Sequence, residues 1–217
     1  MISVALPIHN MDRASFFLQR CLDSILDQSY EDFNVVITDN SDDDKLEKII
    51  RTYGMKIVYY RNPRKGMAEN TNEAIKRSTG QLIKILYMDD YFGHKDALKD
   101  IVEAFRGHWL VTSTDNNHNP YFTEDIHLGN NRLGSPSALT IRNENPLLFD
   151  ENMTWMLDCD YYKRMYDLYG EPTILKIYGR KANVCIGVGE HQMTNILSDG
   201  EKQVEHQYMR NKYAPFT

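Results

Sequence analysis

The sequence predicts an α/β protein with one central, mostly parallel β-sheet flanked by helices. Three short apolar segments, residues 2–6, 33–38 and 56–60, have the length and composition of buried strands, and helical patterns separate them. This alternation is typical of parallel strands joined by right-handed crossovers. A chain of 217 residues can bury one sizeable core, so we expect a single domain.

The first two strands and helices are predicted from apolar spacing and from residues that end an element. The first strand stops at Pro7, which lacks a backbone N–H donor. Between Phe16 and Leu26, apolar residues recur at three- and four-residue intervals, which predicts a helix with one buried face. The second strand runs directly into Asp39, and the helix after it ends at Gly54.

A fourth apolar segment carries two adjacent acids at its end. After the third strand, the pattern predicts a helix over residues 67–78. Residues 82–92 follow as an apolar run, which we expect to be a buried strand that delivers Asp89 and Asp90 to its carboxyl end.

The carboxyl edge of the predicted sheet collects these acids. Because parallel strands share that edge, Asp39, the Asp89 and Asp90 pair and the loop over residues 7–10 should converge there. Ligands of open α/β sheets bind at this edge, and paired acids can hold a hard divalent cation that also touches substrate phosphates. We therefore expect a metal and phosphate site. The alternative is that the two acids only end the strand and open a turn.

The second half of the chain gives weaker patterns. Residues 95–105 predict a helix, whereas residues 107–139 are polar and loop-rich, and we expect them to cover the site or to contact a second substrate. A helix over residues 159–169 has Asp158 at its start, where an Asp can instead serve as a helix cap. Asp160 would point to nearly the opposite side of that helix.

Three further elements are predicted beyond that helix. Residues 174–178 and 182–186 predict strands, and the charged tail over residues 201–217 predicts a loose helix. His191 follows a Gly-rich turn that lies between the second of these strands and the tail. A lone His in this position is more often a surface or packed residue than a ligand, although neutral imidazole does bind metals.

Charge and cysteine content exclude several classes of protein. The chain has 31 acidic and 25 basic residues, a net charge of -6, which disfavours binding to nucleic acid or to an anionic membrane. Cys21, Cys159 and Cys185 are widely spaced and suggest reduced thiols. The N-terminus lacks a signal-peptide pattern, and no apolar run reaches the ~20 residues that span a bilayer. We expect a soluble, cytoplasmic protein without an integral membrane segment.

Several segments, in order along the chain, resemble the motifs of one enzyme family. They are Ser3-Val-Ala-Leu-Pro-Ile-His-Asn10, Leu22 to Phe33, Thr38-Asp-Asn-Ser-Asp42, Gly66 to Ile75, Leu86-Tyr-Met-Asp-Asp90 and Leu157-Asp-Cys-Asp-Tyr-Tyr-Lys-Arg164. Over residues 2–170 the chain resembles the family 2 glycosyltransferases, which have the GT-A fold. The resemblance implies a nucleotide-sugar-binding half over residues 1–106, and an acceptor-side half with a C-terminal tail over residues 107–217.

The resemblance also implies a donor site that uses a metal ion. Its nucleotide-sugar-binding residues would be Pro7, His9, Asn10, Asp39, Gly66, Asn72 and Asp89. Within this set, Asp39 would bind the uracil ring of a UDP-linked sugar, and Asp89 the ribose. Asp90 would hold Mn²⁺ or Mg²⁺ with the diphosphate, and His191 is a candidate for a further metal ligand.

On the acceptor side, the resemblance implies that Asp158 is the catalytic base of an inverting, hexosyltransferase-like enzyme. The acceptor would be a glycan or another hydroxyl compound. Trp155 lies three residues before Asp158 and would stack on an acceptor sugar; a Trp packed under the helix start is the competing interpretation.

The sequence departs from the family pattern at three positions. Tyr87 replaces the first acid of D-x-D, Thr71 replaces an Arg, and Leu157 replaces a Glu. Metal binding would therefore depend on Asp90, with diphosphate and water oxygens completing the shell. These departures also allow a catalytically weak GT-A-like module that binds nucleotide or glycan.

Two other enzyme classes fit the sequence less well. A nucleotidyltransferase would be expected to have a Gly-rich, basic loop after its first strand, and residues 7–10 are neither. A Rossmann dehydrogenase would have G-x-G-x-x-G after a strand, whereas Gly187-Val-Gly189 is an isolated fragment.

Overall fold

The computed structural model describes residues 1–54, 56–176 and 182–214, and it confirms the α/β fold class. Seven strands form the central sheet, in the spatial order β3 (Ile57–Arg61), β2 (Phe33–Asp39), β1 (Ile2–Ile8), β4 (Leu82–Ile85), β7 (Leu139–Arg142), β6 (Trp109–Thr112) and β8 (Thr173–Leu175). Within the described residues, β7 alone runs antiparallel to its two neighbours in this sheet, so the sheet is mostly parallel as predicted.

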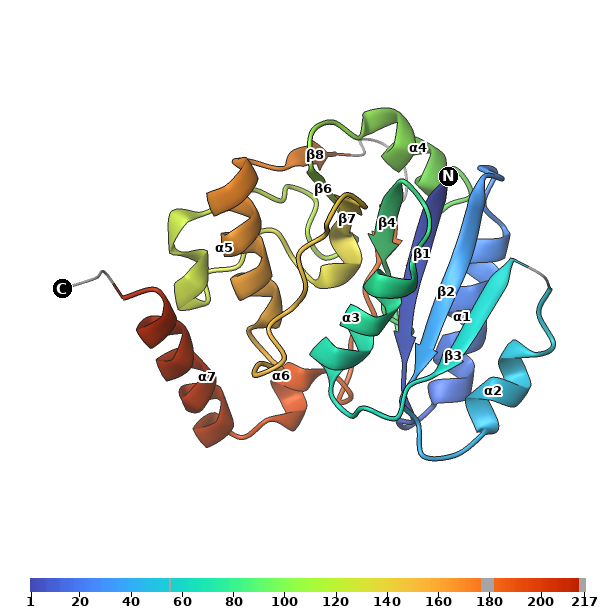
Figure 1. Ribbon diagram of the computed structural model, residues 1–217, viewed down its shortest axis with the longest axis horizontal. Coiled ribbons are helices and arrows are strands. Elements are labelled where there is room, and N and C mark those ends of the chain that lie inside the picture. Colours follow the sequence, from blue (N-terminus) through green and yellow to red (C-terminus); the bar gives the residue numbers. More distant parts are fainter. Residues whose placement is uncertain (55, 177–181, 215–217) are drawn as a thin grey trace.

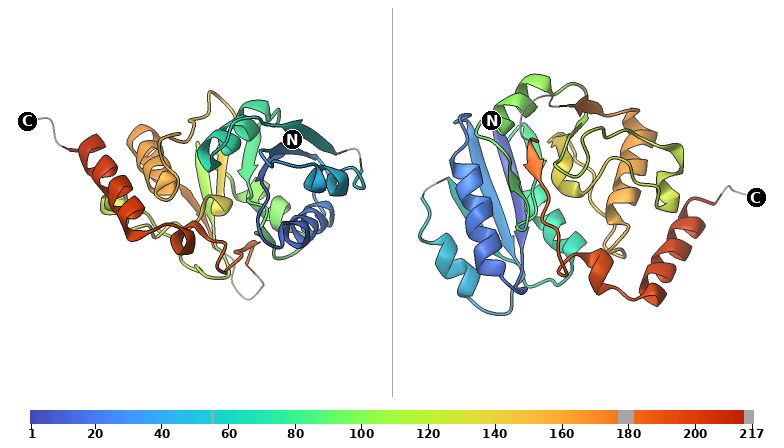
Figure 2. Two further views of the ribbon diagram at one scale, coloured as in Figure 1. Left: turned by 90° about the horizontal axis from the view of Figure 1, so that it is seen from below. Right: turned by 180° about the vertical axis from the view of Figure 1, so that it is seen from behind.

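Helices cover both faces of the sheet (Figures 1 and 2). One face carries α1 (Ala14–Leu26), α2 (Lys45–Ile50) and α4 (Ala97–Ala104), and the other carries α3 (Met67–Arg77) and α5 (Leu157–Tyr169). Each helix contributes its apolar stripe to one of two buried clusters, one on each side of the sheet.

The sequence of β1 explains why both layers form. All seven residues of this strand are buried, and successive side chains point to opposite faces of the sheet. Val4 belongs to the cluster under α1, and Ala5 to the cluster under α3. β1 pairs with β2 so that Ile8 lies opposite Asp39, which aligns the carboxyl ends of both strands. These ends point toward the bottom of Figure 1.

The predicted strand over residues 82–92 is wrong in its length. β4 ends at Ile85, and the chain then turns, with the Asp90 N–H donating to the Tyr87 carbonyl at 3.0 Å. The apolar run continues past β4 because Leu86 is fully buried in the core beneath the turn. The two acids therefore lie in a turn beyond the sheet edge. For the backbone, this is the alternative in which the acids end the strand and open a turn.

A small second sheet follows this turn. It pairs β5 (Tyr91–Phe92) with β9 (Val184–Cys185), so the predicted strand over residues 182–186 forms outside the central sheet. The other predicted strand, 174–178, corresponds to β8, and its residues 177 and 178 lie outside the described residues.

Residues 107–139, which were predicted to be loop, contain one strand of the central sheet and the first residue of another. β6 and the start of β7 lie in it, together with the short 3-10 helices η1 (Glu124–Leu128) and η2 (Pro136–Ala138). Both strands have only four residues, and the polar sequence around them hides their apolar content. Trp109 and Val111 are nevertheless buried beneath the α5 layer. Tertiary packing therefore decides the structure here.

The C-terminal segment forms α6 (Met193–Ile196) and α7 (Asp199–Lys212), which lie beside α5 (Figure 1). α7 is a well-defined helix rather than a loose one, because Ser198 and Glu201 form a reciprocal capping box at its start. The last predicted residues of the tail, 215–217, lie outside the described residues. No helix among the described residues is long and apolar enough to cross a bilayer.

Candidate active site

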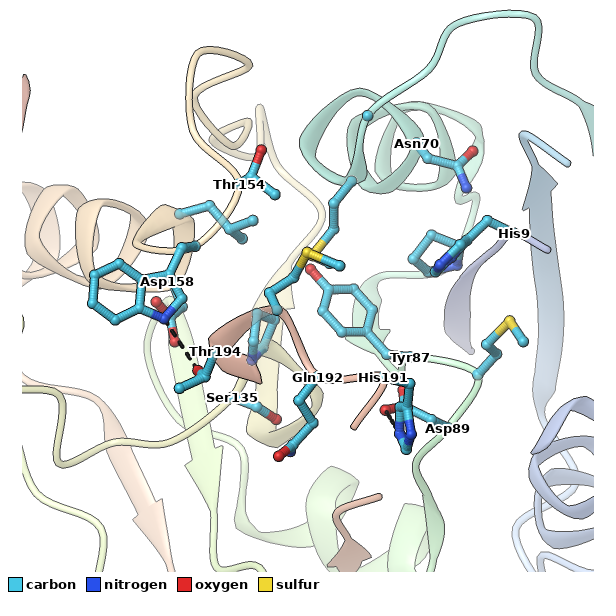
Figure 3. A pocket seen from close by; sticks show the side chains of 18 of the residues that line it. His9, Asn70, Tyr87, Asp89, Ser135, Thr154, Asp158, His191, Gln192 and Thr194 are labelled. Carbon is cyan, nitrogen blue, oxygen red and sulfur yellow. Dashed lines mark hydrogen bonds and ion pairs between the residues drawn. The ribbon is translucent and has the colours of Figure 1, made fainter. Parts of the chain in front are cut away.

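A cavity of about 690 Å³ lies at the carboxyl edge of the sheet. Its walls come from the ends of β1 and β2, the start of α3, the turn after β4, the start of α5 and the segment around α6. Figure 3 shows Asp89 and Asp158 on opposite sides of this cavity, with Tyr87 in the space between them. The fold thus brings together residues from both halves of the chain.

The loop after β1 forms part of the cavity wall. Pro7, His9 and Asn10 all line the cavity. Burial lowers the pKa of His9, although the nearby charge of Asp89 opposes this. His9 is therefore a neutral imidazole at physiological pH, which can donate one hydrogen bond and accept another.

Asp39 is fully buried behind this wall and is not among the residues that line the cavity. Its Oδ1 accepts from the Ser41 N–H at 2.8 Å, and its Oδ2 accepts from the Tyr59 hydroxyl at 2.8 Å. The Arg61 guanidinium lies 3.4 Å from Oδ2. The carboxylate thus fixes the loop after β2, and its contact with a uracil ring stays a prediction. The next residue, Asn40, does line the cavity.

Gly66, which lines the cavity, has a left-handed backbone with φ of 117° just before α3. L side chains rarely adopt this φ, so the turn into the helix favours glycine. Lys65 also lines the cavity, and its ammonium donates to the Asn40 carbonyl at 2.6 Å. Its position after the third predicted strand indicated that it could reach a nucleotide, but most such charges are solvated, and the sequence-based site leaves it out.

Of the two asparagines in α3, the structure places Asn70 rather than Asn72 at the cavity. The Asn70 amide donates to the backbone carbonyls of Ile8 and Thr38, at 2.9 and 3.0 Å, and so joins the ends of β1 and β2. Asn72 instead exchanges two hydrogen bonds with the Phe149 backbone, at 2.7 and 2.9 Å. We therefore leave Asn72 out of the proposed site.

Asp89 and Asp90 occupy the turn at the centre of the cavity wall. Asp90 is only 3% exposed, and its Oδ1 accepts from the Gly187 N–H at 2.7 Å. Asp89 Oδ2 lies 3.1 Å from His191 Nε2 (Figure 3). Burial raises the pKa of both carboxyls, and the charge of Asp89 raises that of Asp90 further. A nearby positive charge would favour the ionised form of both carboxyls and lower their pKa values.

The donor atoms at this turn fit a divalent cation that also binds substrate. Carboxylate oxygens suit Mg²⁺ and Mn²⁺, and Mg²⁺ is usually bound by one or two carboxylates plus substrate phosphates. No group of three His, Cys, Asp or Glu side chains that could hold a metal occurs in the described part of the chain. Tyr87 occupies the position at which the family's D-x-D motif has its first acid. Burial raises the pKa of the Tyr87 phenol, which therefore stays protonated. Diphosphate and water oxygens would have to complete the shell.

Two basic side chains lie near the acid turn, and sequence reasoning missed both. The Arg20 guanidinium donates to the Asp89 carbonyl and lies 4.3 Å from the centre of the Tyr91 ring. Lys84 is fully buried in β4, where its side-chain nitrogen donates to the Ser137 and Leu139 carbonyls. The position of Lys84 inside the apolar run Leu-Ile-Lys-Ile could have indicated a buried Lys.

Asp158 is the second residue of α5 and lines the cavity on the side opposite Asp89 (Figure 3). Its Oδ1 accepts from the Cys159 N–H at 2.7 Å, and its Oδ2 accepts from the Asn131 amide at 2.8 Å. The residue at the N-cap of α5 is Met156, so Asp158 does not occupy the capping position. Burial raises the pKa of Asp158 to about 6. Such a carboxylate is ionised at neutral pH and is still basic enough to accept a proton.

Asp160 points away from the cavity, as its spacing from Asp158 predicts. It is fully buried, and it accepts from Arg164 Nε at 2.8 Å and from the Tyr213 hydroxyl at 2.8 Å. Lys212 Nζ lies 2.7 Å from its Oδ1. Asp160 is therefore a structural acid that joins α5 to α7.

Trp155 lines the cavity beside Asp158. Its indole N–H donates to the Thr194 hydroxyl at 3.1 Å, and the His206 ring contacts it edge-on at a centroid distance of 5.2 Å. The ring is half-buried, so the geometry provides an aromatic wall without deciding between packing and stacking on a sugar.

Comparisons with known proteins identify the family and the fold of the chain. The family model described as "Glycosyl transferase family 2" matches residues 3–163. A chondroitin synthase from Pasteurella multocida (strain Pm70) is 32% identical over 130 residues, which are 55% of this chain and 13% of that protein. The chain spans less than a third of the length of the first curated relatives that it matches.

Solved structures show the same fold. S. aureus TarS 1-349 in complex with UDP-GlcNAc has a TM-score of 0.62 at 18% identity, over 94% of this chain and 64% of that one. The mannosyltransferase PcManGT from Pyrobaculum calidifontis, in complex with GDP-Man and Mn²⁺, has a TM-score of 0.70 at 15% identity. That match covers 100% of this chain and 65% of the other. The chain therefore belongs to glycosyl transferase family 2 and has the GT-A fold.

Proposed function

We propose that this protein is an inverting glycosyltransferase that moves a sugar from a UDP-linked donor to an acceptor hydroxyl, with Asp158 as the general base. The observation that carries the proposal is the position of Asp158 across one cavity from the Asp89 and Asp90 turn. A basic carboxylate on one side and a place for a diphosphate on the other are the two requirements of such a transfer.

The donor would lie along the wall formed by the loop after β1 and the start of α3. Asn10, Gly66 and Asp89 line this wall, and neutral His9 lies among them as a hydrogen-bonding group. Choice of uracil follows from the family resemblance. One structural neighbour is a complex with UDP-GlcNAc and another with GDP-Man, so the base is the part of the proposal that most needs measurement.

The transfer itself would be a single in-line displacement. Asp158 accepts the proton of the acceptor hydroxyl while that oxygen bonds to the anomeric carbon, and the bond from this carbon to the diphosphate breaks. Attack from the face opposite the leaving group inverts the anomeric centre. A Mn²⁺ or Mg²⁺ ion held by Asp90, with His191 as a second candidate ligand, would neutralise charge on the departing diphosphate.

The first test is calorimetric titration of the protein with UDP, GDP and CDP, each with and without Mn²⁺. Binding that is selective for UDP and stronger with metal is expected, and it would justify screening UDP-sugars for transfer. Tighter binding of GDP would reject uracil as the base of the donor, and it would still support the proposed glycosyltransferase activity.

Absence of binding to every nucleotide in the presence of metal would instead favour a catalytically weak module that binds glycan. Tyr87, where the family has an acid, is the observation behind this second candidate. Glycan arrays would then identify its ligand.

A further inference from the structure

The carboxylate of Glu205, on α7, accepts hydrogen bonds from three consecutive backbone N–H groups just before α5. Its Oε1 accepts from Thr154 at 2.8 Å, and its Oε2 accepts from Met156 at 2.8 Å. The Trp155 N–H, between them, lies 3.1 and 2.9 Å from the two oxygens. One side chain, some fifty residues away in sequence, thus fixes the backbone that leads to Asp158.

The start of α5 needs such an acceptor. Met156 at the N-cap has no side-chain oxygen, so it makes no side-chain capping hydrogen bond. The N–H groups of residues 154–156 lead directly into the start of α5, and a carboxylate is favoured near the positive end of a helix dipole. Glu205 supplies from another helix what the local sequence lacks.

α7 is also attached on both sides of Asp158, at two further acids. Lys212 Nζ lies 2.6 Å from Asp150 and 2.7 Å from Asp160. The Tyr208 hydroxyl donates to Asp150 at 2.8 Å. The helix therefore holds the segment 150–160 at both ends. α7 lies outside residues 3–163, which the family model matches.

We propose that Glu205 is a positioning residue of the transfer reaction. By holding the backbone of residues 154–156, it keeps Trp155 and Asp158 directed into the cavity. This inference rests on the proposed role of Asp158 as the base, and it adds a part of the machinery that lies on the C-terminal helix.

The test compares Glu205→Ala and Glu205→Gln with the wild-type protein, and uses Asp199→Asn as a matched control. Gln keeps one acceptor oxygen, and Ala keeps none. Both remove the same charge, so a difference between them reports position rather than electrostatics. Asp199 is on the same helix with a side chain that is 98% exposed, and its change to Asn removes an equal charge away from the cavity.

Steady-state kinetics with the donor and acceptor that the wild type uses give the first readout. Glu205→Ala should lower kcat by on the order of 100-fold, the scale of a misplacement of about 1 Å in a catalytic constellation. Glu205→Gln should lose less. The donor KM and the Kd for UDP should stay within about twofold in both, because the donor wall does not contact Glu205. Equal kcat in all four proteins would overturn the proposal, and so would parallel loss of kcat and UDP binding.

A second readout does not need turnover. NMR titration of the Asp158 carboxyl should give a lower pKa in Glu205→Ala than in Glu205→Gln, because the released segment exposes the carboxyl to water. Amide exchange at residues 154–156 should quicken in the same order. If wild-type protein transfers no sugar, the proposed function fails, yet these measurements still decide whether Glu205 positions Asp158. An identical Asp158 pKa in the two variants rejects that role.

Discussion

The Asn131 amide donates a 2.8 Å hydrogen bond to Oδ2 of Asp158, from a loop 27 residues earlier in the chain. Asn131 is itself fixed, because its own Oδ1 accepts from the Leu133 and Gly134 N–H groups. The ionised form of Asp158 therefore meets a preoriented donor, which lowers its pKa against the stronger, opposite effect of burial.

Replacing Asn131 by Ala should shift the acid limb of the pH profile. The bond stabilises the ionised carboxylate, so its loss raises the pKa of Asp158 above about 6. Since the base must be ionised, kcat/KM falls as the pH drops through this pKa, and the variant should lose activity at a higher pH than wild type. The profile of kcat/KM between pH 5 and 9 measures the shift. Asn119→Ala, at an exposed loop position, is the control. An unmoved limb would show that Asn131 does not act on the base.

Asp158→Asn should retain nucleotide binding and lose transfer. General-base catalysis contributes about 10²- to 10⁴-fold, so kcat should fall by that factor while the Kd for UDP stays unchanged. Calorimetry and a transfer assay on the same preparation measure both. Asp167→Asn, an acid on the outer side of the same helix, should be active. Near wild-type turnover by Asp158→Asn would place the base elsewhere.

Asp90→Asn should abolish the effect of Mn²⁺ on UDP binding. Interactions with a charged partner contribute about 1.5–3 kcal/mol, so metal-supported affinity should fall roughly 10- to 100-fold. Affinity without metal should change little. Paired titrations with Mn²⁺ and with EDTA measure the difference. If the variant keeps its full response to Mn²⁺, the cation binds at other residues.

Lys84→Met should flatten the dependence of stability on pH between about 7 and 10. Burial lowers the pKa of Lys84 to about 7 from the ordinary 10.5, so in this interval the unfolded chain binds a proton that the folded chain does not. Stability should therefore rise with pH in the wild type through this group, and the Met variant lacks that contribution. Denaturant midpoints at pH 7 and 9.5 for both proteins give the two slopes. Equal slopes would mean that Lys84 is charged in the folded state.

Local sequence patterns were sufficient for the first half of the fold. The strands at residues 2–6 and 33–38 are buried on both faces, so their apolar runs are unambiguous, and the helices between them carry clear apolar stripes. The four-residue β6 gave no comparable signal, because its burial depends on α5, which lies some fifty residues later in the chain.

The candidate site divides in the same way. The acids at strand ends could be found from the sequence, since a parallel sheet brings those ends together. The residues around Asp158 could not be found in this way, because Asn131 and Glu205 contact the start of α5 from distant segments of the chain. The amide at the cavity is Asn70 rather than Asn72, a choice that depends on helix orientation and not on motif spacing.

The attachment of α7 also bears on where the catalytic unit ends. A recombinant fragment trimmed to the region of family similarity would stop at residue 163, within α5. It would leave the three N–H groups at residues 154–156 without their carboxylate and Asp160 without Lys212. Boundary choices for expression or domain exchange should therefore retain residues 199–212, since a homology-based cut removes α7, which contributes His206 to the cavity wall.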